Sequence, residues 1–264
     1  MTRPVIAFIT DFGTRDHYAG SMKGVVLSIC PEATIVDITH DIPPHDVLAG
    51  ALELVAVYKY FPKGTIFLVV IDPGVGSSRR ALVVDTGEFR FVVPDNGLMT
   101  LVCRESPPTK IIEVIDQRYT LSTVSKTFEG RDRFAPVAAW VAQGIQLQDL
   151  GKSVKDYKKI EIPEATLLEK SIKGTVLRVD HFGNLVTNIN RSNFEKLASD
   201  GPVQVMIDGK SIGPIVSTYS DVNKGQLCAL FGSTGHLEVA ANGVSVVEKF
   251  GWSFGTEVSV MKLL

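Results

Sequence analysis

Short apolar runs alternate with amphipathic helical stretches through the first half of the chain. His17–Ile29 and Asp46–Tyr60 have helical spacing, and Asp46, which follows two prolines, is expected to cap the second helix. Strand–helix–strand alternation predicts a mostly parallel sheet with right-handed crossovers. The runs expected to be strands buried on both faces are rich in β-branched residues and bounded by loop residues: Val5–Thr10, Thr34–Thr39 and Thr65–Asp72.

The first domain is expected to continue to residue 161. Its remaining elements are a hairpin across Gly87 (Arg80–Thr86 and Phe89–Val93), a helix near Leu98–Cys103, a strand at Ile111–Asp116 and a helix at Phe134–Ala142. We expect residues 162–173 to form a linker between two domains. Short strands with turn signals then predict a small all-β domain over 174–264: Gly174–Val179, Leu185–Ile189, Val203–Ile207, Leu227–Phe231, His236–Ala240 and Val258–Lys262.

Composition narrows the classes of partner. The 264 residues are 45% apolar and 21% charged, with a net charge of −2, which is typical of a soluble protein with a sizeable core. Proteins that bind nucleic acids or anionic membranes usually carry an excess of basic residues, which this chain lacks. No run approaches the roughly 18 apolar residues of a membrane span, and we interpret the N-terminus as the first strand and not as a signal peptide. Cys30, Cys103 and Cys228 lie far apart, which favours buried thiols in a reducing, cytoplasmic setting.

Two carboxylates follow predicted parallel strands. Asp11 and Asp72 each precede a glycine-bearing loop, and ligands of such sheets bind outside the carboxyl ends of the strands. A carboxylate there commonly accepts hydrogen bonds from ribose hydroxyls, although capping of the turn is the simpler alternative. The phosphate-binding GxGxxG and P-loop patterns are absent, as are GxSxG and HExxH. A nucleotide ligand would therefore be held by its ribose and base.

Three further polar segments are candidates for chemistry. Residues 40–46 (HDIPPHD) could hold a metal, but we expect a solvated turn and a helix cap. Arg131 and Asp132 form either an ion pair near a helix start or part of a site. Residues 180–188 offer a carboxylate, an amide and an aromatic ring, which suit a purine edge and face.

Together these segments resemble one family, the S-adenosylmethionine (SAM) hydroxide adenosyltransferases, which are related to SAM-dependent fluorinases and chlorinases. The resemblance runs through nearly the whole chain, and its motifs occur in order. They are ITDFGTRDHYAGSMKGV (9–25), SICPEATIVDITHDIPPHDV (28–47), FPKGTIFLVVIDPGVGSSRR (61–80), PDNGLMT (94–100), FEGRDRFAP (128–136), VDHFGNLVTNI (179–189) and FGSTGHLEVAANG (231–243).

The resemblance implies an α/β fold with a Rossmann-like, mostly parallel N-terminal domain and a smaller β-barrel-like C-terminal domain. It also implies a homotrimer, with SAM between the N-terminal domain of one subunit and the C-terminal domain of its neighbour, and neither metal nor cofactor. Carried over by position, Asp11 resembles the carboxylate of the ribose diol and Asp16 a group near the methionine ammonium. By the same resemblance, His45 takes the place of an aromatic wall, and Phe128 and Phe182 lie beside the nucleoside. Adenine would be recognised by Asn184 and by the backbone of Ala241 and Gly243. Asp180, Ser233 and Glu238 would lie at the methionine end or at the nucleoside edge.

Asp72 separates the branches of this family, because the similar halogenating enzymes carry tyrosine here. A halide about 4 Å from a carboxylate is repelled by roughly 4 kcal/mol at an effective dielectric near 20, about a thousandfold in affinity. The water-using branch combines this aspartate with an arginine seven residues later, here Arg79, and with a histidine that this chain replaces by Glu129. Three interpretations stay open: Glu129 serves as acceptor or base, Asp72 and Arg79 suffice, or this member is slow or altered.

We therefore expect an enzyme that hydrolyses SAM at ribose C5′ by an activated water, giving adenosine and L-methionine. Asp72, Arg79 and Glu129 are the catalytic candidates. Three alternatives are a halogenase-type reaction, a SAM- or adenosine-binding protein with little turnover, and a metal-dependent phosphohydrolase. Asp72 argues against the first, and Glu129 keeps the second open.

Overall fold

A computed structural model describes residues 3–122, 126–199 and 201–263. Its contacts divide the chain into two compact units, residues 1–160 and 161–264, which we describe separately. Strand β8 (Thr166–Leu167) and the first residues of β9 (Ser171–Val179) lie in the range expected to be a linker.

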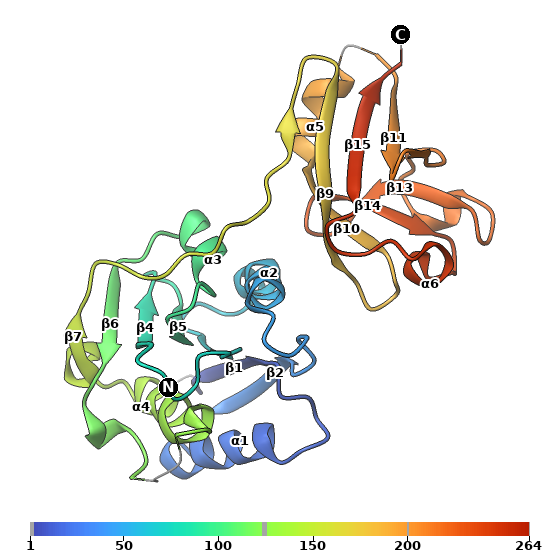
Figure 1. Ribbon diagram of the computed structural model, residues 1–264. Helices are drawn as coiled ribbons and strands as arrows, with labels where there is room; N and C mark the ends of the chain where they lie inside the picture. Colours follow the sequence, from blue (N-terminus) through green and yellow to red (C-terminus); the bar gives the residue numbers. More distant parts are fainter. Residues whose placement is uncertain (1–2, 123–125, 200, 264) are drawn as a thin grey trace. The chain divides into compact units, whose positions relative to one another are not determined.

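A seven-stranded sheet forms the middle layer of the N-terminal unit, with the order β2-β1-β3-β5-β4-β6-β7 (Figure 1). The pairs β1–β2, β1–β3 and β3–β5 are parallel, whereas β4–β5, β4–β6 and β6–β7 are antiparallel, so the sheet is mixed. The expected hairpin across Gly87 causes this change, because it returns the chain beside the preceding strand. The strands are β1 (Val5–Thr10), β2 (Thr34–Thr39), β3 (Ile66–Val70), β4 (Ala81–Asp85), β5 (Arg90–Pro94), β6 (Lys110–Val114) and β7 (Gly151–Ser153).

Helices cover both faces of this sheet. Helices α1 (Tyr18–Ile29) and α4 (Ala135–Ala142) pack on one face, and α2 (Val47–Val57) and α3 (Thr100–Glu105) pack on the other (Figure 1). Strands β1 and β3 are buried on both faces, as expected. The same expectation is wrong for β2, which is half-exposed because it forms the edge of the sheet.

The parallel pairing of β1 with β3 brings the two predicted carboxylates to one edge. Thr10 lies opposite Val70 in the register, so Asp11 and Asp72 both follow strands that end at the same side of the sheet. This part of the prediction is confirmed, and it depends only on strand direction and length.

The C-terminal unit is a curled antiparallel sheet with the order β12-β11-β15-β9-β10-β14-β13 (Figure 1). The all-β expectation missed two helices, α5 (Arg191–Ala198) and α6 (Val246–Phe250). Asn190 caps α5 by accepting a hydrogen bond from the Asn193 amide, and such caps are a sequence signal for a helix start. The remaining strands are β10 (Leu185–Asn190), β11 (Val203–Ile207), β12 (Lys210–Ser211), β13 (Leu227–Phe231), β14 (His236–Ala241) and β15 (Glu257–Lys262).

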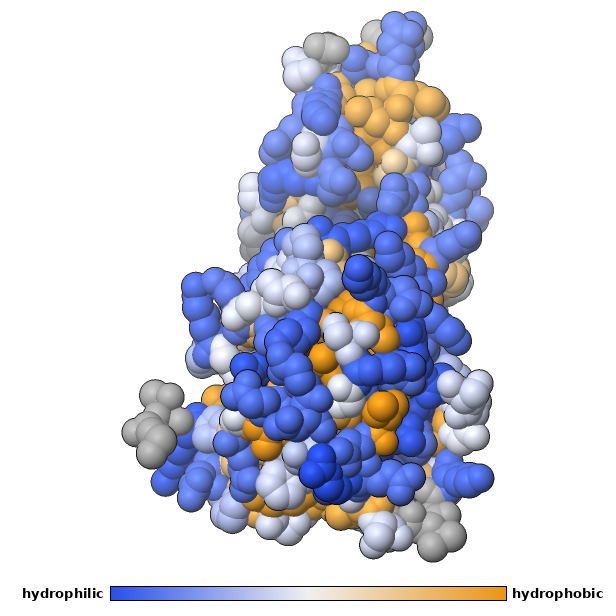
Figure 2. Space-filling model, turned by 90° about the vertical axis from the view of Figure 1, so that its left-hand side faces the viewer, coloured by the Kyte–Doolittle hydropathy of each residue, from blue (hydrophilic) through white to orange (hydrophobic). Residues whose placement is uncertain are grey.

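The exposed surface is mostly polar, and the cysteines are buried. On the face drawn in Figure 2, apolar atoms form separate areas between polar ones. The three cysteines are free and buried, and burial raises the pKa of each thiol. None of the helices in the described ranges has the length and apolar character needed to cross a membrane.

Replacing the N-cap of α2 should weaken the N-terminal unit. The Asp46 side chain accepts a hydrogen bond of 2.9 Å from the Ala49 amide, as the sequence predicted. Asp46→Ala should lower the free energy of unfolding by about 1 kcal/mol, because the amide loses its partner, whereas Asp46→Asn should retain most of it. Urea titrations followed by Trp140 fluorescence in a Trp252→Phe background measure this unit. Equal losses in both variants would contradict the capping role.

Candidate active site

A buried cluster of charges lies where the sheet edge meets the segment before α4. Arg79 donates from Nε to both carboxylate oxygens of Asp72, at 2.9 Å each. Its Nη2 forms a second contact with Asp72 and also reaches the Glu129 carboxylate. One guanidinium therefore joins two carboxylates, and all three residues predicted to be catalytic lie in one network.

The cluster is nearly closed to solvent. The side chains of Asp72 and Arg79 are 5% and 3% exposed, and that of Glu129 is 16% exposed. Burial alone would lower the pKa of Arg79, but the hydrogen bonds and charges of Asp72 and Glu129 outweigh it and raise that pKa. Arg79 Nη1 is buried and has no hydrogen-bond partner among the described residues. This N–H group can donate to a small polar molecule that enters the site.

The loop between β3 and β4 builds this geometry. Ser77 Oγ donates to the Gly74 carbonyl at 2.6 Å and accepts from the Arg79 amide at 3.2 Å. Immediately after it, Arg80 donates to Asp95 at 2.8 Å. Asp95 in turn accepts from the Lys158 amide at 2.7 Å. The position of Arg79 is thus fixed from both directions along the chain.

Glu129 precedes a five-residue π-helix, η3 (Gly130–Phe134), which runs directly into α4. Such irregular helical turns often occur at functional sites. While one Glu129 oxygen contacts Arg79, the other lies 3.6 Å from Arg133 Nη1. Glu129 and Arg133 also line a cavity of about 660 Å³. Arg131 and Asp132 form the anticipated ion pair, at 2.6 Å.

Asp11 is held by the loop before α2. Its Oδ2 accepts a hydrogen bond of 2.8 Å from the His45 amide, and His45 has a left-handed backbone (φ 68°). Such a conformation is uncommon outside glycine, so the contact marks an unusually constrained loop. Asp16 is exposed, and it lies in the same loop as Asp11, between β1 and α1. Phe128 is buried against Phe12 and Tyr18, whose ring centroids lie 5.9 and 5.0 Å away.

One expectation for this loop is wrong. Residues 40–46 were expected to form a solvated turn with a helix cap, and the cap is present, but His40 is buried. The ring is taken into the interior by contacts from β1 and β2, which a local sequence pattern cannot reveal. No group of three or more His, Cys, Asp or Glu side chains within the described ranges is arranged to hold a metal ion.

A second polar cluster lies in the C-terminal unit. Asp180 accepts hydrogen bonds from the amides of Phe182 and Asn184, at 2.9 and 2.8 Å, and from the Asn184 side-chain nitrogen at 2.9 Å. Asp180 therefore stabilises its own turn and orients the Asn184 side chain. The side-chain oxygen of Asn184 can then accept a hydrogen bond from a ligand. The Phe182 side chain is 74% exposed, so its ring face is open for stacking.

Glu238 belongs to this cluster and has a partner that sequence reasoning missed. Tyr219 Oη donates to Glu238 Oε2 at 2.9 Å, and Glu238 is 7% exposed. Burial and the Glu238 contact raise the pKa of Tyr219 to about 12. Tyr219 begins a short 3-10 helix, η5 (Tyr219–Asp221), and nothing in the spacing of its neighbours marks it as a partner of Glu238. Ser233 and Gly243 are exposed on nearby turns, while Ala241 is buried at the end of β14.

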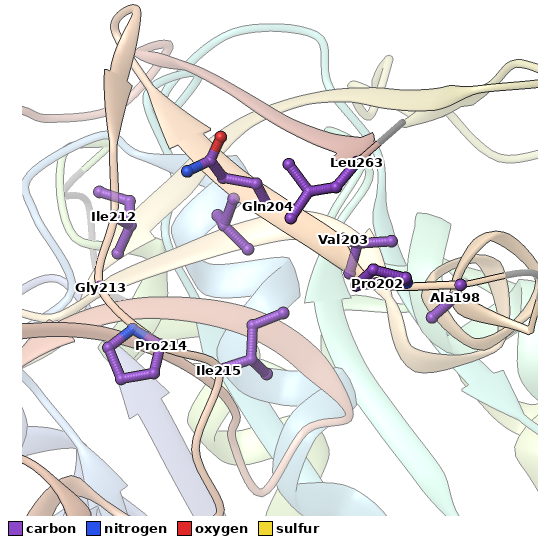
Figure 3. Close-up of a pocket in the computed structure, with 11 residues that line it drawn as sticks. Ala198, Pro202, Val203, Gln204, Ile212, Gly213, Pro214, Ile215 and Leu263 are labelled. Carbon is purple, nitrogen blue, oxygen red and sulfur yellow. The ribbon is translucent and has the colours of Figure 1, made fainter.

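The C-terminal unit also contains an apolar cavity of about 510 Å³ that the prediction did not include (Figure 3). The end of α5, β11 and residues 212–215 form its walls. None of the described residues that line it carries an ionisable side chain, so it lacks groups for acid–base chemistry.

Comparison with known proteins identifies the family. Models of the SAM hydroxide adenosyltransferase N-terminal and C-terminal domains match residues 6–151 and 174–259. The chain belongs to the SAM hydroxide adenosyltransferase family. Within this family, the chain is 34% identical over 260 residues to a protein of Salinispora tropica named (R)-S-adenosyl-L-methionine hydrolase, with 97% of each chain covered.

Other proteins are similar over nearly the whole chain. A Thermus thermophilus protein with the same name is 35% identical, with 98% of this chain and 100% of the relative covered. A fluorinase of Actinoplanes sp. is 29% identical, with 98% of each covered. The crystal structure of a conserved protein from Thermotoga maritima superposes with a TM-score of 0.91 at 35% identity, covering 97% of this chain and 100% of that one.

Glu238→Gln should remove a pH-dependent loss of stability. Burial raises the pKa of Glu238 above its ordinary value of 4.5, and the Tyr219 hydrogen bond opposes this only in part. A raised pKa means that Glu238 contributes its full stability below pH 4.5 and loses it as the pH rises through the folded-state value. The free energy of unfolding of Glu238→Gln should therefore exceed that of the wild type at pH 7 and match it near pH 4.

Denaturant titrations at a series of pH values measure this difference. Glu257→Gln, which changes an exposed carboxylate of the same unit, is the matched control. A stability difference for Glu238→Gln that stays constant between pH 4 and 7 would rule out the buried-carboxyl account.

Proposed function

We propose that the protein hydrolyses SAM at ribose C5′ to give adenosine and L-methionine. The observation that carries the proposal is the buried Asp72–Arg79 pair at the carboxyl edge of the sheet, beside Glu129. The names of the similar hydrolases from Salinispora tropica and Thermus thermophilus support the same reaction. Both relatives match nearly the whole chain, so the proposal concerns both of its units.

The reaction is an in-line displacement. The oxygen of one water forms a bond to C5′ while the bond from C5′ to sulfur breaks. The electron pair of that bond stays on sulfur, which changes from a sulfonium to the neutral thioether of methionine. The proton of the attacking water leaves for a carboxylate and then for solvent. Because the sulfonium is already a good leaving group, the protein needs only to position the water and accept its proton.

Asp72 and Arg79 divide these tasks. Asp72 accepts the proton of the attacking water. Arg79 fixes the Asp72 carboxylate through its Nε and Nη2, and its unpaired, buried Nη1 donates to the water and stabilises hydroxide character. The carboxylate also disfavours a halide nucleophile by the repulsion described above. The fluorinase relatives therefore provide an alternative chemistry that Asp72 argues against.

Glu129 acts on Arg79 as a positioning group. It accepts from Nη2, the same nitrogen that contacts Asp72, and so holds the plane of the guanidinium against that carboxylate. Arg133 offsets the added negative charge at the other Glu129 oxygen. In this role Glu129 takes the place of the histidine that the resemblance leads one to expect. In this account, the residue at position 129 has to accept a hydrogen bond from Arg79 and does not have to take up a proton.

The remaining residues bind the substrate. We assign Asp11 to the ribose hydroxyls, Phe128 and Phe182 to the nucleoside faces and Asn184 to the adenine edge. Asp16, His45, Asp180, Ser233, Glu238 and the backbone at Ala241 and Gly243 complete the binding set. The family resemblance also supports a homotrimer that shares each site between subunits, a Rossmann-like N-terminal domain, a barrel-like C-terminal domain, a cytoplasmic location and catalysis without a cofactor.

Incubation of the purified protein with SAM tests the proposal. Chromatography should show equal amounts of adenosine and methionine, with the same products at high chloride. Tight SAM binding in calorimetry with no product over hours would instead favour a binding protein. A 5′-chloro-nucleoside at high chloride would favour the halogenase alternative.

Asp72→Asn should lower kcat by about a hundredfold or more, because a positioned general base contributes about 10²–10⁴-fold. The KM for SAM should change much less, since the amide keeps the shape of the carboxylate. Asp85→Asn is the matched control, because Asp85 ends β4 and pairs with Arg90 away from the cluster. Near wild-type turnover in Asp72→Asn would disprove the role of Asp72.

Substitutions at Glu129 separate an acceptor from a base. Glu129→Gln and Glu129→His keep an acceptor for Arg79 and should retain kcat within about tenfold, whereas Glu129→Leu removes the acceptor and should lose more. Steady-state kinetics of the three variants distinguish a hydrogen-bond acceptor from a general base at this position. If Glu129→Gln were as inactive as Asp72→Asn, Glu129 would itself be the base.

A further inference from the structure

His40 is a buried histidine that the proposed reaction does not use. It directly follows β2, at the start of the segment that leads to α2, and is 4% exposed. Its Nδ1 lies 2.8 Å from Thr10 Oγ1, and its Nε2 lies 3.1 Å from Asp37 Oδ1. Lys23 Nζ contacts the other oxygen of Asp37 at 2.5 Å. A row of four polar side chains therefore runs from the end of β1 to the surface.

The inner end of this row joins two loops. Thr10 immediately precedes Asp11, and its hydroxyl oxygen also accepts from the Phe12 amide at 3.3 Å. The Gly13 amide donates to the His40 carbonyl at 2.7 Å, and the Ile42 amide donates to the Thr10 carbonyl at 3.4 Å. Together with the His45 amide on Asp11, these bonds connect residues 10–13 to residues 40–45 on both sides of Asp11.

Among these bonds, only the one between Thr10 and His40 joins two side chains, and both residues are buried. Thr10 is 0% exposed, so its hydroxyl cannot attack a substrate, and a catalytic role for the pair is excluded by burial. A buried polar pair of this kind is costly to leave unsatisfied, since each lost partner removes a hydrogen bond that water cannot replace. Such a pair fixes the geometry of the backbone that carries it.

We propose that His40 is a positioning residue, which through Thr10 holds the Asp11 loop in the geometry that binds the ribose hydroxyls of the substrate. The inference rests on the proposed function, because Asp11 is assigned there to the ribose. His40 touches neither the substrate nor the reacting atoms in this account. Its loss affects binding of the nucleoside more than the chemical step at C5′.

Thr10 offers the sharpest test, because valine has nearly the same shape as threonine. Thr10→Val leaves His40 Nδ1 and the Phe12 amide without a partner, and Thr10→Ser restores the hydroxyl. Thr10→Val should raise the KM for SAM and the Kd for adenosine by about tenfold, with kcat changed less than threefold, because small displacements of binding groups have effects of this order. Thr10→Ser should stay within about threefold of the wild type in all three constants.

Two substitutions of His40 separate the inner contact from the outer one. The amide of His40→Asn can occupy the place of Nδ1 and keep the bond to Thr10, whereas that of His40→Gln reaches the place of Nε2 and keeps the contact with Asp37. His40→Asn should bind adenosine within about threefold of the wild type, and His40→Gln about tenfold more weakly. Thermal unfolding confirms that each variant is folded at the assay temperature.

The outcomes distinguish the two claims. If the wild type releases no adenosine from SAM, the proposed function fails. If it does, and Thr10→Val and His40→Gln bind SAM and adenosine as the wild type does, only the positioning role of His40 is overturned. A loss confined to kcat with KM unchanged would overturn it as well.

Discussion

The site of the N-terminal unit depends on one buried guanidinium. Arg79 has a side chain that is 3% exposed, and removal of a charge from water costs several kcal/mol unless opposite charges and hydrogen bonds replace the lost solvation. Asp72 and Glu129 supply these from the β3–β4 loop and from the start of η3. The cluster therefore ties the β3–β4 loop, which carries both Asp72 and Arg79, to the segment that begins η3. Among the described residues, Arg79 Nη1 has no hydrogen-bond partner, so one donor of the buried guanidinium is left unused by the protein.

Strand direction explains why this charge cluster and Asp11 lie at the same edge of the sheet. The parallel pairing of β1 and β3 delivers Asp11 and Asp72 to the same edge, and each loop is then fixed by different means. The Asp72 loop is held by ion pairs through Arg79 and Arg80, and the Asp11 loop by backbone bonds and the buried Thr10–His40 pair. The C-terminal unit adds aromatic and amide groups of a different kind.

Much of the framework could be predicted from the sequence. The bounds of β1, β2 and β13 agree with the expected strands, and Asp46 caps α2, because apolar runs and caps are local features. The exposure of β2 and the burial of His40 depend on which elements pack together, so the local pattern could not give them. The hairpin across Gly87 implied the antiparallel pairing of β4 with β5, but not that of β6 with β4 and β7. Helix α5 was missed although Asn190 marks its start, and Tyr219 was missed because it meets Glu238 only through the fold.

The central claim is that water attacks C5′ of SAM, and isotopic labelling tests it most directly. When SAM is incubated with the protein in water enriched in oxygen-18, mass spectrometry should find one heavy oxygen in each adenosine, at the 5′-hydroxyl, and none in methionine. Adenosine without the label, or a labelled methionine, would show that the bond broken or the nucleophile is different and would contradict the account.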